Sequence, residues 1–185
     1  MIRINTPLTN EACADLMAGD MVLLSGVVYT ARDAAHALMV QALEAEDKLP
    51  FDLSGSVIYY TGPCPAPPGR PVGSCGPTTS GRMDSYAARL LSAGVKGMIG
   101  KGERSSEVQT AIAEEKAVYL AAPGGAGAYL AACVQTAEVI AYPELGAEAV
   151  RRLQVVDLPC VVAIDSKGNN LYHLGRKKYS QSGGR

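Results

Sequence analysis

Three short segments of the chain each carry a cation, and the first two also carry hydroxyl and acidic residues. They are YTARD at 29–33, GPTTSGRMD at 76–84 and IGKG at 99–102. The cations are Arg32, Arg82 and Lys101, and the second segment adds the hydroxyl groups of Thr78, Thr79 and Ser80. Arginine binds carboxylates through paired hydrogen bonds, so three such cations would suit a small molecule with two carboxylates.

Each segment stands where a predicted strand gives way to a predicted helix. The strands are expected at 21–29, 57–61 and 95–99, and the helices at about 31–46, 82–93 and 105–115. In open α/β folds ligands bind beyond the carboxyl ends of the strands, and free N–H groups at helix N-termini favour anions. If the three junctions converge, they form one anion pocket.

The remaining elements predict a mixed α/β domain with a partly parallel sheet. We expect a strand at 118–121, a short helix at 126–132, and further strands at 134–142, 150–157 and 161–164. Thr30 is the expected N-cap of the first long helix, with Asp33 in its first turn, and Ser105 is the expected cap of a later helix. A single domain over 1–174 would then be followed by a mobile, basic tail at 175–185.

The stretch GPCPAPPGRPVGSCGP at 62–77 has few charges and many prolines, which is typical of a rigid functional loop rather than a flexible linker. The formal charge of −1 gives no basic field for nucleic acid. Long apolar runs and a signal-peptide layout are absent from the sequence, so we expect a soluble cytoplasmic protein with no membrane contact. Two histidines and five cysteines without a C-x-x-C pattern argue against a metal site in this chain.

Each single feature also has a plainer interpretation. An arginine in a first helical turn is commonly a solvated surface residue, and the TTSGR run alone is typical of a cap and turn. Asp84 is either a base or a structural partner of Arg82 or Arg89. The GGAGA stretch at 124–128 lacks the full spacing of a dinucleotide loop, which leaves a nucleotide-binding domain as a weak alternative.

Longer motifs carry a more specific resemblance. They occur in one order along about residues 3–172: SGVVYTARDAAH, IYYTGPCPAPPGRPVGSCGPTTSGRMDSYAARLL, GVKGMIGKG, ELGAEAV and LPCVVAIDSKGN. This series resembles the β-type domain of the class I, iron–sulfur fumarate hydratases and tartrate dehydratases. The resemblance implies a swivelling β/β/α-type fold and a hydro-lyase activity on a dicarboxylate.

The resemblance also implies roles for individual residues. Thr78 would be the base that takes the C3 proton, with Asp84 as the second candidate. The carboxylates of the substrate would be held by Arg32, Arg82 and Lys101, with Thr79 beside them. Fixed positive charge at these positions suits a reaction that builds a dianionic aci-carboxylate.

In that family a separate α-type module binds a 4Fe-4S cluster through three cysteines. This chain lacks the cluster pattern, so the resemblance implies a β subunit that is active only with an α subunit, in a possible dimer of heterodimers. Fumarate and L-malate are the expected substrate pair. Tartrate dehydration, or a non-catalytic module that binds dicarboxylates, are the alternatives.

Overall fold

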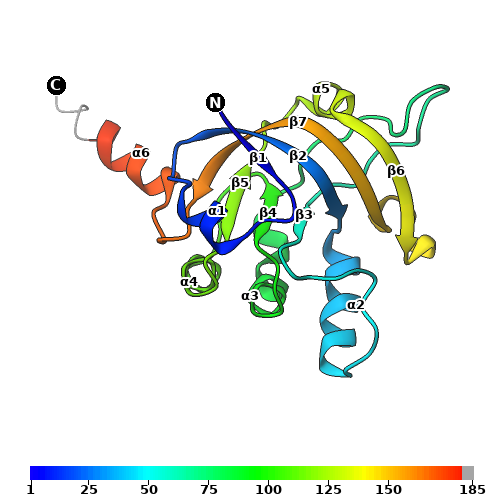
Figure 1. Ribbon diagram of the computed structural model, residues 1–185, viewed down its shortest axis with the longest axis horizontal. Helices are drawn as coiled ribbons and strands as arrows, with labels where there is room; N and C mark the ends of the chain where they lie inside the picture. The colour runs from blue at the N-terminus through cyan, green and yellow to red at the C-terminus, as the bar shows by residue number, and fades with distance from the viewer. Residues whose placement is uncertain (181–185) are drawn as a thin grey trace.

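The sheet of the protein closes on itself into a ring (Figure 1). The computed structural model describes residues 1–180, and in that range seven strands follow the order β1-β2-β3-β4-β5-β7-β6. They are β1 (Ile2–Asn5), β2 (Met21–Thr30), β3 (Val57–Tyr59), β4 (Gly97–Gly100), β5 (Val118–Ala121), β6 (Val134–Ala141) and β7 (Val150–Ile164). Because β2 also pairs with β7, the ring runs through β2, β3, β4, β5 and β7, and β1 and β6 extend it.

The strand directions confirm the predicted mixed, partly parallel sheet. Strands β1 to β5 pair in parallel, whereas β7 is antiparallel to β2, β5 and β6. The carboxyl ends of β2, β3, β4 and β5 therefore lie at the same edge of the sheet. This is the edge at which all three cation-bearing segments leave their strands.

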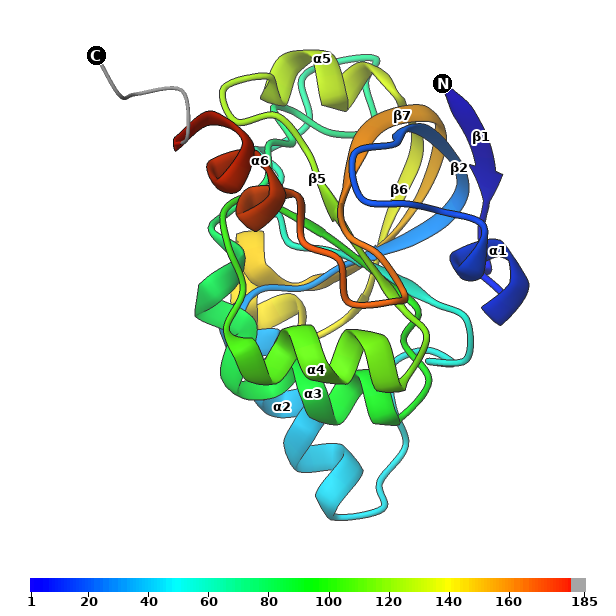
Figure 2. The same ribbon diagram turned by 90° about the vertical axis from the view of Figure 1, so that its left-hand side faces the viewer.

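The helices lie on two sides of this ring. They are α1 (Asn10–Ala14), α2 (Asp33–Glu44), α3 (Asp84–Ser92), α4 (Ser106–Glu114), α5 (Gly127–Ala132) and α6 (Leu171–Ser180), with 3-10 turns η1 (Ser80–Met83) and η2 (Pro143–Glu148). Helices α2, α3 and α4 gather on one side, and α5 lies on the opposite side (Figures 1 and 2). Across residues 1–180 none of these helices is long and apolar enough to span a membrane.

Both faces of the central strands are buried, which gives two apolar cores. In β3, Val57 and Tyr59 join the core inside the ring, whereas Ile58 joins the core beneath the helices. The same alternation holds in β5, where Leu120 faces the inner core and Tyr119 the outer one. Near-continuous apolar runs such as these are what parallel strands covered on both faces require.

The chain from 150 to 164 forms one long strand where the sequence predicts two. The break was expected at 158–160, and the preceding Asp157 takes a left-handed conformation with φ 50°. The partner strand accommodates it, because β2 shifts register between Leu24 and Gly26, and Gly26 has φ 111°. The Asp157 amide donates to the Ser25 hydroxyl at 2.9 Å, so a bulge absorbs the irregularity and pairing continues.

Helix boundaries agree with the sequence prediction except at the start of α2. Ser105 caps α4 by accepting a hydrogen bond from the Val108 amide at 3.3 Å, as predicted. The prediction that Thr30 caps α2 was wrong. The Thr30 hydroxyl instead donates to the Ala149 carbonyl at 3.2 Å and accepts from the Arg151 amide at 3.0 Å, because β7 lies alongside the end of β2.

Elements at the two ends of the chain were not predicted. Strand β1 and helix α1 precede β2, and helix α6 follows β7. Helix α6 carries the first part of the predicted tail at 175–185 up to Ser180, and the rest of that tail lies outside the described residues.

The proline-rich loop after β3 is cross-linked by backbone hydrogen bonds. The amide of Cys64 donates to Ser74 at 2.9 Å, and the amide of Gly73 donates back to Cys64 at 3.0 Å. The Tyr59 hydroxyl donates to the carbonyl of Cys75 at 2.6 Å, which attaches the end of the loop to the inner core. These contacts give the loop a defined path between the first and second cation-bearing segments.

Candidate active site

An ion pair joins the first two cation-bearing segments. Arg82 donates from Nε to the carboxylate of Asp33 at 2.9 Å, across 49 positions of sequence. The same carboxylate lies 4.0 Å from Arg32, so one acidic group faces both arginines. Asp33 was predicted only as a first-turn residue of a helix, and its role as a link between the segments was missed.

Backbone pairing joins the second and third segments. Thr79 forms a parallel bridge with Lys101, in which the Lys101 amide donates to Thr78 at 3.2 Å and the Ser80 amide donates to Lys101 at 2.9 Å. The Thr78 amide in turn donates to Tyr60 at 2.7 Å. The half-buried Thr78 and the exposed Lys101 therefore lie on adjacent backbone segments just beyond β3 and β4.

Close packing explains the glycine before Lys101. A Cβ atom on Gly100 would lie 1.9 Å from the Ser80 hydroxyl oxygen, a distance that requires displacement of the Ser80 segment. The absence of a side chain at this position allows the loops of Thr78 and Lys101 to approach each other. All three predicted segments thus meet at one edge of the sheet.

Arg32 is the most enclosed of the three cations. Its side chain is 22% exposed, and its guanidinium lies 3.0 Å from the carboxylate of Glu148. Its Nε atom is buried and has no hydrogen-bond partner within residues 1–180. A Cβ atom on Gly62 would lie 3.2 Å from the Arg32 guanidinium, so the start of the proline-rich loop packs against this arginine.

Glu148 reaches the site from the turn before β7. Its second carboxylate oxygen accepts a hydrogen bond from the Ala34 amide at 3.3 Å and so provides the N-terminal cap for α2 that was assigned to Thr30. Arg151 fixes this turn by donating to the carbonyls of Gly146, at 2.8 Å, and Ala147, at 3.1 Å. Glu148 lies within the ELGAEAV motif of the sequence, but its spacing gave no sign of contact with Arg32.

The GGAGA stretch forms a wall beside Lys101. A Cβ atom on Gly124 would lie 3.6 Å from the Lys101 side chain, and one on Gly127 would lie 2.3 Å from the Ser74 hydroxyl oxygen. The Cys75 amide also donates to the carbonyl of Gly127 at 3.0 Å. Close packing against the proline-rich loop therefore accounts for the glycine at 127.

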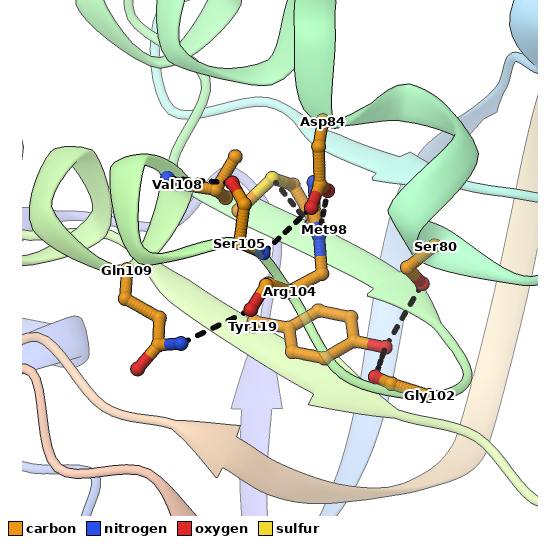
Figure 3. Close-up of polar contacts among 9 residues, drawn as sticks. All are labelled: Ser80, Asp84, Met98, Gly102, Arg104, Ser105, Val108, Gln109 and Tyr119. Carbon is orange, nitrogen blue, oxygen red and sulfur yellow. Dashed lines mark hydrogen bonds and ion pairs between the residues drawn. The ribbon is translucent and has the colours of Figure 1, made fainter.

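Asp84 is occupied by structural contacts, and its partner differs from both residues suggested by the sequence. Its carboxylate accepts from Arg104 Nε at 2.6 Å and from the Ser105 amide at 2.6 Å (Figure 3). Arg82 pairs with Asp33 instead. A carboxylate committed to a fully buried arginine and to a helix N-terminus is poorly disposed to accept a substrate proton.

His36 and three of the cysteines are buried. His36 is buried behind Arg32, and burial lowers its pKa to about 4. Burial also raises the thiol pKa of Cys13 and Cys75 to about 11, and that of Cys160 to about 12. Among the described residues, His, Cys, Asp and Glu form no group of three or more with metal-binding geometry.

The sequence matches the family described as Fumarase C-terminus over residues 1–175. The chain belongs to this family. It is 42% identical over 151 residues to the protein named Fumarate hydratase class I, anaerobic, of Escherichia coli, which covers 80% of this chain. It is 40% identical over 156 residues to Fumarate hydratase 2 of Leishmania major, which covers 83% of this chain.

This member of the Fumarase C-terminus family differs from those relatives in length. It spans 28% of the E. coli enzyme and 28% of the Leishmania enzyme. A third relative is of matching length: a Methanocaldococcus jannaschii protein named "Putative L(+)-tartrate dehydratase subunit beta" is 39% identical, with 92% of this chain and 91% of that protein aligned.

The site of this family member has an excess of positive charge. Arg32 and Arg82 pair with two carboxylates, those of Asp33 and Glu148, and Asp84 pairs with Arg104. The arginines are thus oriented before a ligand arrives, and the exposed Lys101 adds a further positive charge. This arrangement is chemically suited to bind a small dianion.

Proposed function

We propose that this chain is the β subunit of a two-subunit hydro-lyase that interconverts a 2-hydroxy dicarboxylate and its dehydrated product. L-Malate and fumarate are the proposed pair. The single observation that carries the proposal is the convergence of Arg32, Arg82, Lys101 and Thr78 from three segments that are far apart in sequence. The presence of fumarate hydratases among the relatives supports the same reaction class.

The cations would hold the two carboxylates of the substrate. Arg32 and Arg82 are each kept in place by an acidic residue, so little conformational entropy is lost when they bind. Removal of a proton next to a carboxylate builds a second negative charge on that group. Fixed cations such as Lys101 stabilise this charge in the transition state, and Thr79 adds a neighbouring polar group.

Thr78 is the proposed base for the C3 proton. Both of its backbone polar groups are hydrogen-bonded, to Tyr60 and to Lys101, which fixes the position of its backbone. A threonine hydroxyl is a weak base by itself. Neighbouring cations favour its alkoxide form, and the Lys101 segment directly beside it supplies one.

We infer that an α-type partner subunit holds a 4Fe-4S cluster that supplies a Lewis acid for the leaving hydroxyl. The donor set of this chain supports that division, because its described residues offer no cluster site. The matched fumarate hydratase is much longer than this chain, which also supports a partner subunit. A cytoplasmic dimer of heterodimers is the proposed assembly.

Tartrate dehydration is the second candidate, and the tartrate dehydratase β subunit of matching length favours it. Tartrate and malate differ by one hydroxyl group, a difference of about 1–3 kcal/mol for a single contact. A non-catalytic dicarboxylate-binding module is the remaining alternative. It would have no use for Thr78 beside the cations.

The test is an anaerobic affinity purification of the tagged chain from its native cells. Bound proteins are identified by mass spectrometry, iron is quantified, and the eluate is assayed for fumarate hydration and for tartrate dehydration. We expect a stoichiometric iron-bearing partner with fumarate hydratase activity. A chain without partner and iron, obtained under conditions that preserve labile clusters, would favour the binding module instead.

A further inference from the structure

A buried polar cluster lies directly beneath the loops that carry Thr78 and Lys101 (Figure 3). It contains Ser80, Asp84, Arg104 and Tyr119, and the side chains of Ser80, Arg104 and Tyr119 are buried. These residues lie behind the cations in the outer core rather than among them. Buried polar groups of this kind are costly unless they are satisfied, so their contacts call for a physical explanation.

Tyr119 connects the two loops from a third strand, β5. Its hydroxyl lies 2.9 Å from the Ser80 hydroxyl and 2.8 Å from the carbonyl oxygen of Gly102. A carbonyl oxygen only accepts, and a tyrosine hydroxyl has a single proton. Tyr119 therefore donates to Gly102 and accepts from Ser80, which fixes the direction of both hydrogen bonds.

Asp84 and Arg104 form a second connection between the loop of Thr78 and the loop of Lys101. Asp84 follows the η1 turn after the threonines, and it binds Arg104 and the Ser105 amide, which follow Lys101. The Arg104 guanidinium carbon lies 5.1 Å from the centre of the Tyr119 ring. The aromatic ring of Tyr119 thus contacts the pair of Arg104 and Asp84 on one side and the two loops on the other, so its hydroxyl has a defined position.

The positions of the connected atoms indicate what the cluster controls. Ser80 lies two residues after Thr78, and Gly102 lies one residue after Lys101. The Ser80 amide also donates to the Lys101 carbonyl at 2.9 Å. A shift of Gly102 away from Ser80 would therefore change the separation between the proposed base and the proposed carboxylate-binding lysine.

We propose that Tyr119 is a positioning residue of the hydro-lyase, whose hydroxyl sets the separation of Thr78 and Lys101 through Ser80 and Gly102. This inference rests on the proposed function. Packing alone does not explain the hydroxyl, because phenylalanine at 119 with alanine at 80 would fill nearly the same volume and leave only the partly exposed Gly102 carbonyl without its partner. Replacement of both partners by apolar groups is commonly near neutral for stability.

The test compares Tyr119→Phe, Ser80→Ala and the double variant in the complex with the α-type partner. Tyr179→Phe, at a residue that is 70% exposed, is the matched control. We expect Tyr119→Phe to lower kcat by roughly 10- to 100-fold with KM changed by less than about threefold, as for a displacement of reacting groups. The double variant should lose activity similarly while its thermal midpoint stays within a few degrees of wild type.

A Lys101→Ala background separates positioning from general damage. If Tyr119 acts through Lys101, the additional loss from Tyr119→Phe in that background should fall below about threefold, because coupled residues are non-additive. A kcat of Tyr119→Phe close to wild type overturns the inference. An equal loss of activity in both backgrounds overturns it as well.

A crystal structure of the Tyr119→Phe chain gives a readout that is independent of activity. We expect residues 100–103 to move relative to residues 78–80, and an unchanged backbone there overturns the inference. A wild-type complex that acts on none of fumarate, L-malate and tartrate would instead refute the proposed function. The crystal structure would still decide the positioning claim in that event.

Discussion

Arg82 and Asp33 form an ion pair at 2.9 Å that joins the start of helix α2 to the segment before helix α3. The same carboxylate lies 4.0 Å from Arg32, so it orients Arg82 and adds negative charge beside Arg32. The ion pair is half exposed and contributes little to stability by itself. Its consequence is geometric, because it presents the two guanidinium groups as a pair.

The orienting role of Asp33 is tested by two substitutions. In the assembled enzyme, Asp33→Ala should lower kcat/KM for the dicarboxylate about tenfold or more, since Arg82 loses the group that holds it. Asp33→Asn should stay within about threefold of wild type, because its amide oxygen still accepts the hydrogen bond from Arg82. Steady-state kinetics of both variants measure this difference, and equal activity of the two would contradict an orienting role. Asp47→Ala, at an exposed position, is the control.

Glu148 should contribute to both stability and substrate binding. It caps α2 through the Ala34 amide at 3.3 Å and pairs with Arg32 at 3.0 Å. Glu148→Ala should therefore lower the free energy of unfolding by about 1 kcal/mol, the usual value of a helix cap. Urea denaturation measures this loss, with Glu144→Ala on the same turn as the control. An unchanged denaturation midpoint would show that the cap contributes nothing.

Asp84 should act on stability rather than on catalysis. Asp84→Asn leaves the fully buried Arg104 without its counter-charge, which should cost about 3 kcal/mol or more in the free energy of unfolding. The surface pair of Arg152 and Glu138, at 2.8 Å, offers a matched control. Glu138→Gln should cost less than about 1 kcal/mol. If Asp84→Asn proved as stable as wild type but inactive in the complex, Asp84 would become the better candidate for the base.

His36 predicts a specific dependence of stability on pH. Burial lowers its pKa to about 4 in the folded chain, with Arg104 lowering it further and Asp33 opposing that shift. The unfolded chain binds a proton near pH 6.5, so this residue destabilises the fold progressively as the pH falls from about 6.5 to 4. The full effect is about 3 kcal/mol.

Urea denaturation of wild type and His36→Gln at pH 7 and pH 5 measures this contribution. The variant should lose less stability between the two pH values than wild type does. His173→Gln, at an exposed position, is the control. Identical losses for His36→Gln and wild type would show that His36 titrates normally in the folded chain.

The meeting of the three cation-bearing segments could be predicted from sequence because strand ends are easy to recognise. Apolar runs that end before TARD and GKG show where two of the strands stop, and parallel strands bring their ends to one edge. Asp33 and Glu148 were missed as site residues for a different reason. Their contacts with Arg82 and Arg32 depend on how helix α2 and the turn before β7 are placed in space, which local periodicity does not encode.

The closure of the sheet into a ring could not be predicted from local sequence patterns either. The sequence predicts a break at 158–160 between two strands, whereas the shifted register at Gly26 on the opposite strand allows β7 to continue. Likewise, Thr30 has the residue type of a helix cap, yet the neighbouring strand takes its hydroxyl. In both cases a contact with a segment more than 100 residues away overrides a local preference.

The most direct test of the proposed catalytic role of this chain is the turnover of a complex assembled with Thr78→Val. Valine keeps the shape of threonine and removes only the hydroxyl group proposed as the base. We expect kcat to fall by at least about 100-fold, the usual contribution of a positioned base, with complex formation and iron content unchanged. Thr110→Val, on the exposed face of α4, should remain fully active. A Thr78→Val complex that turns over within about threefold of wild type would contradict the proposed role of this chain in the reaction.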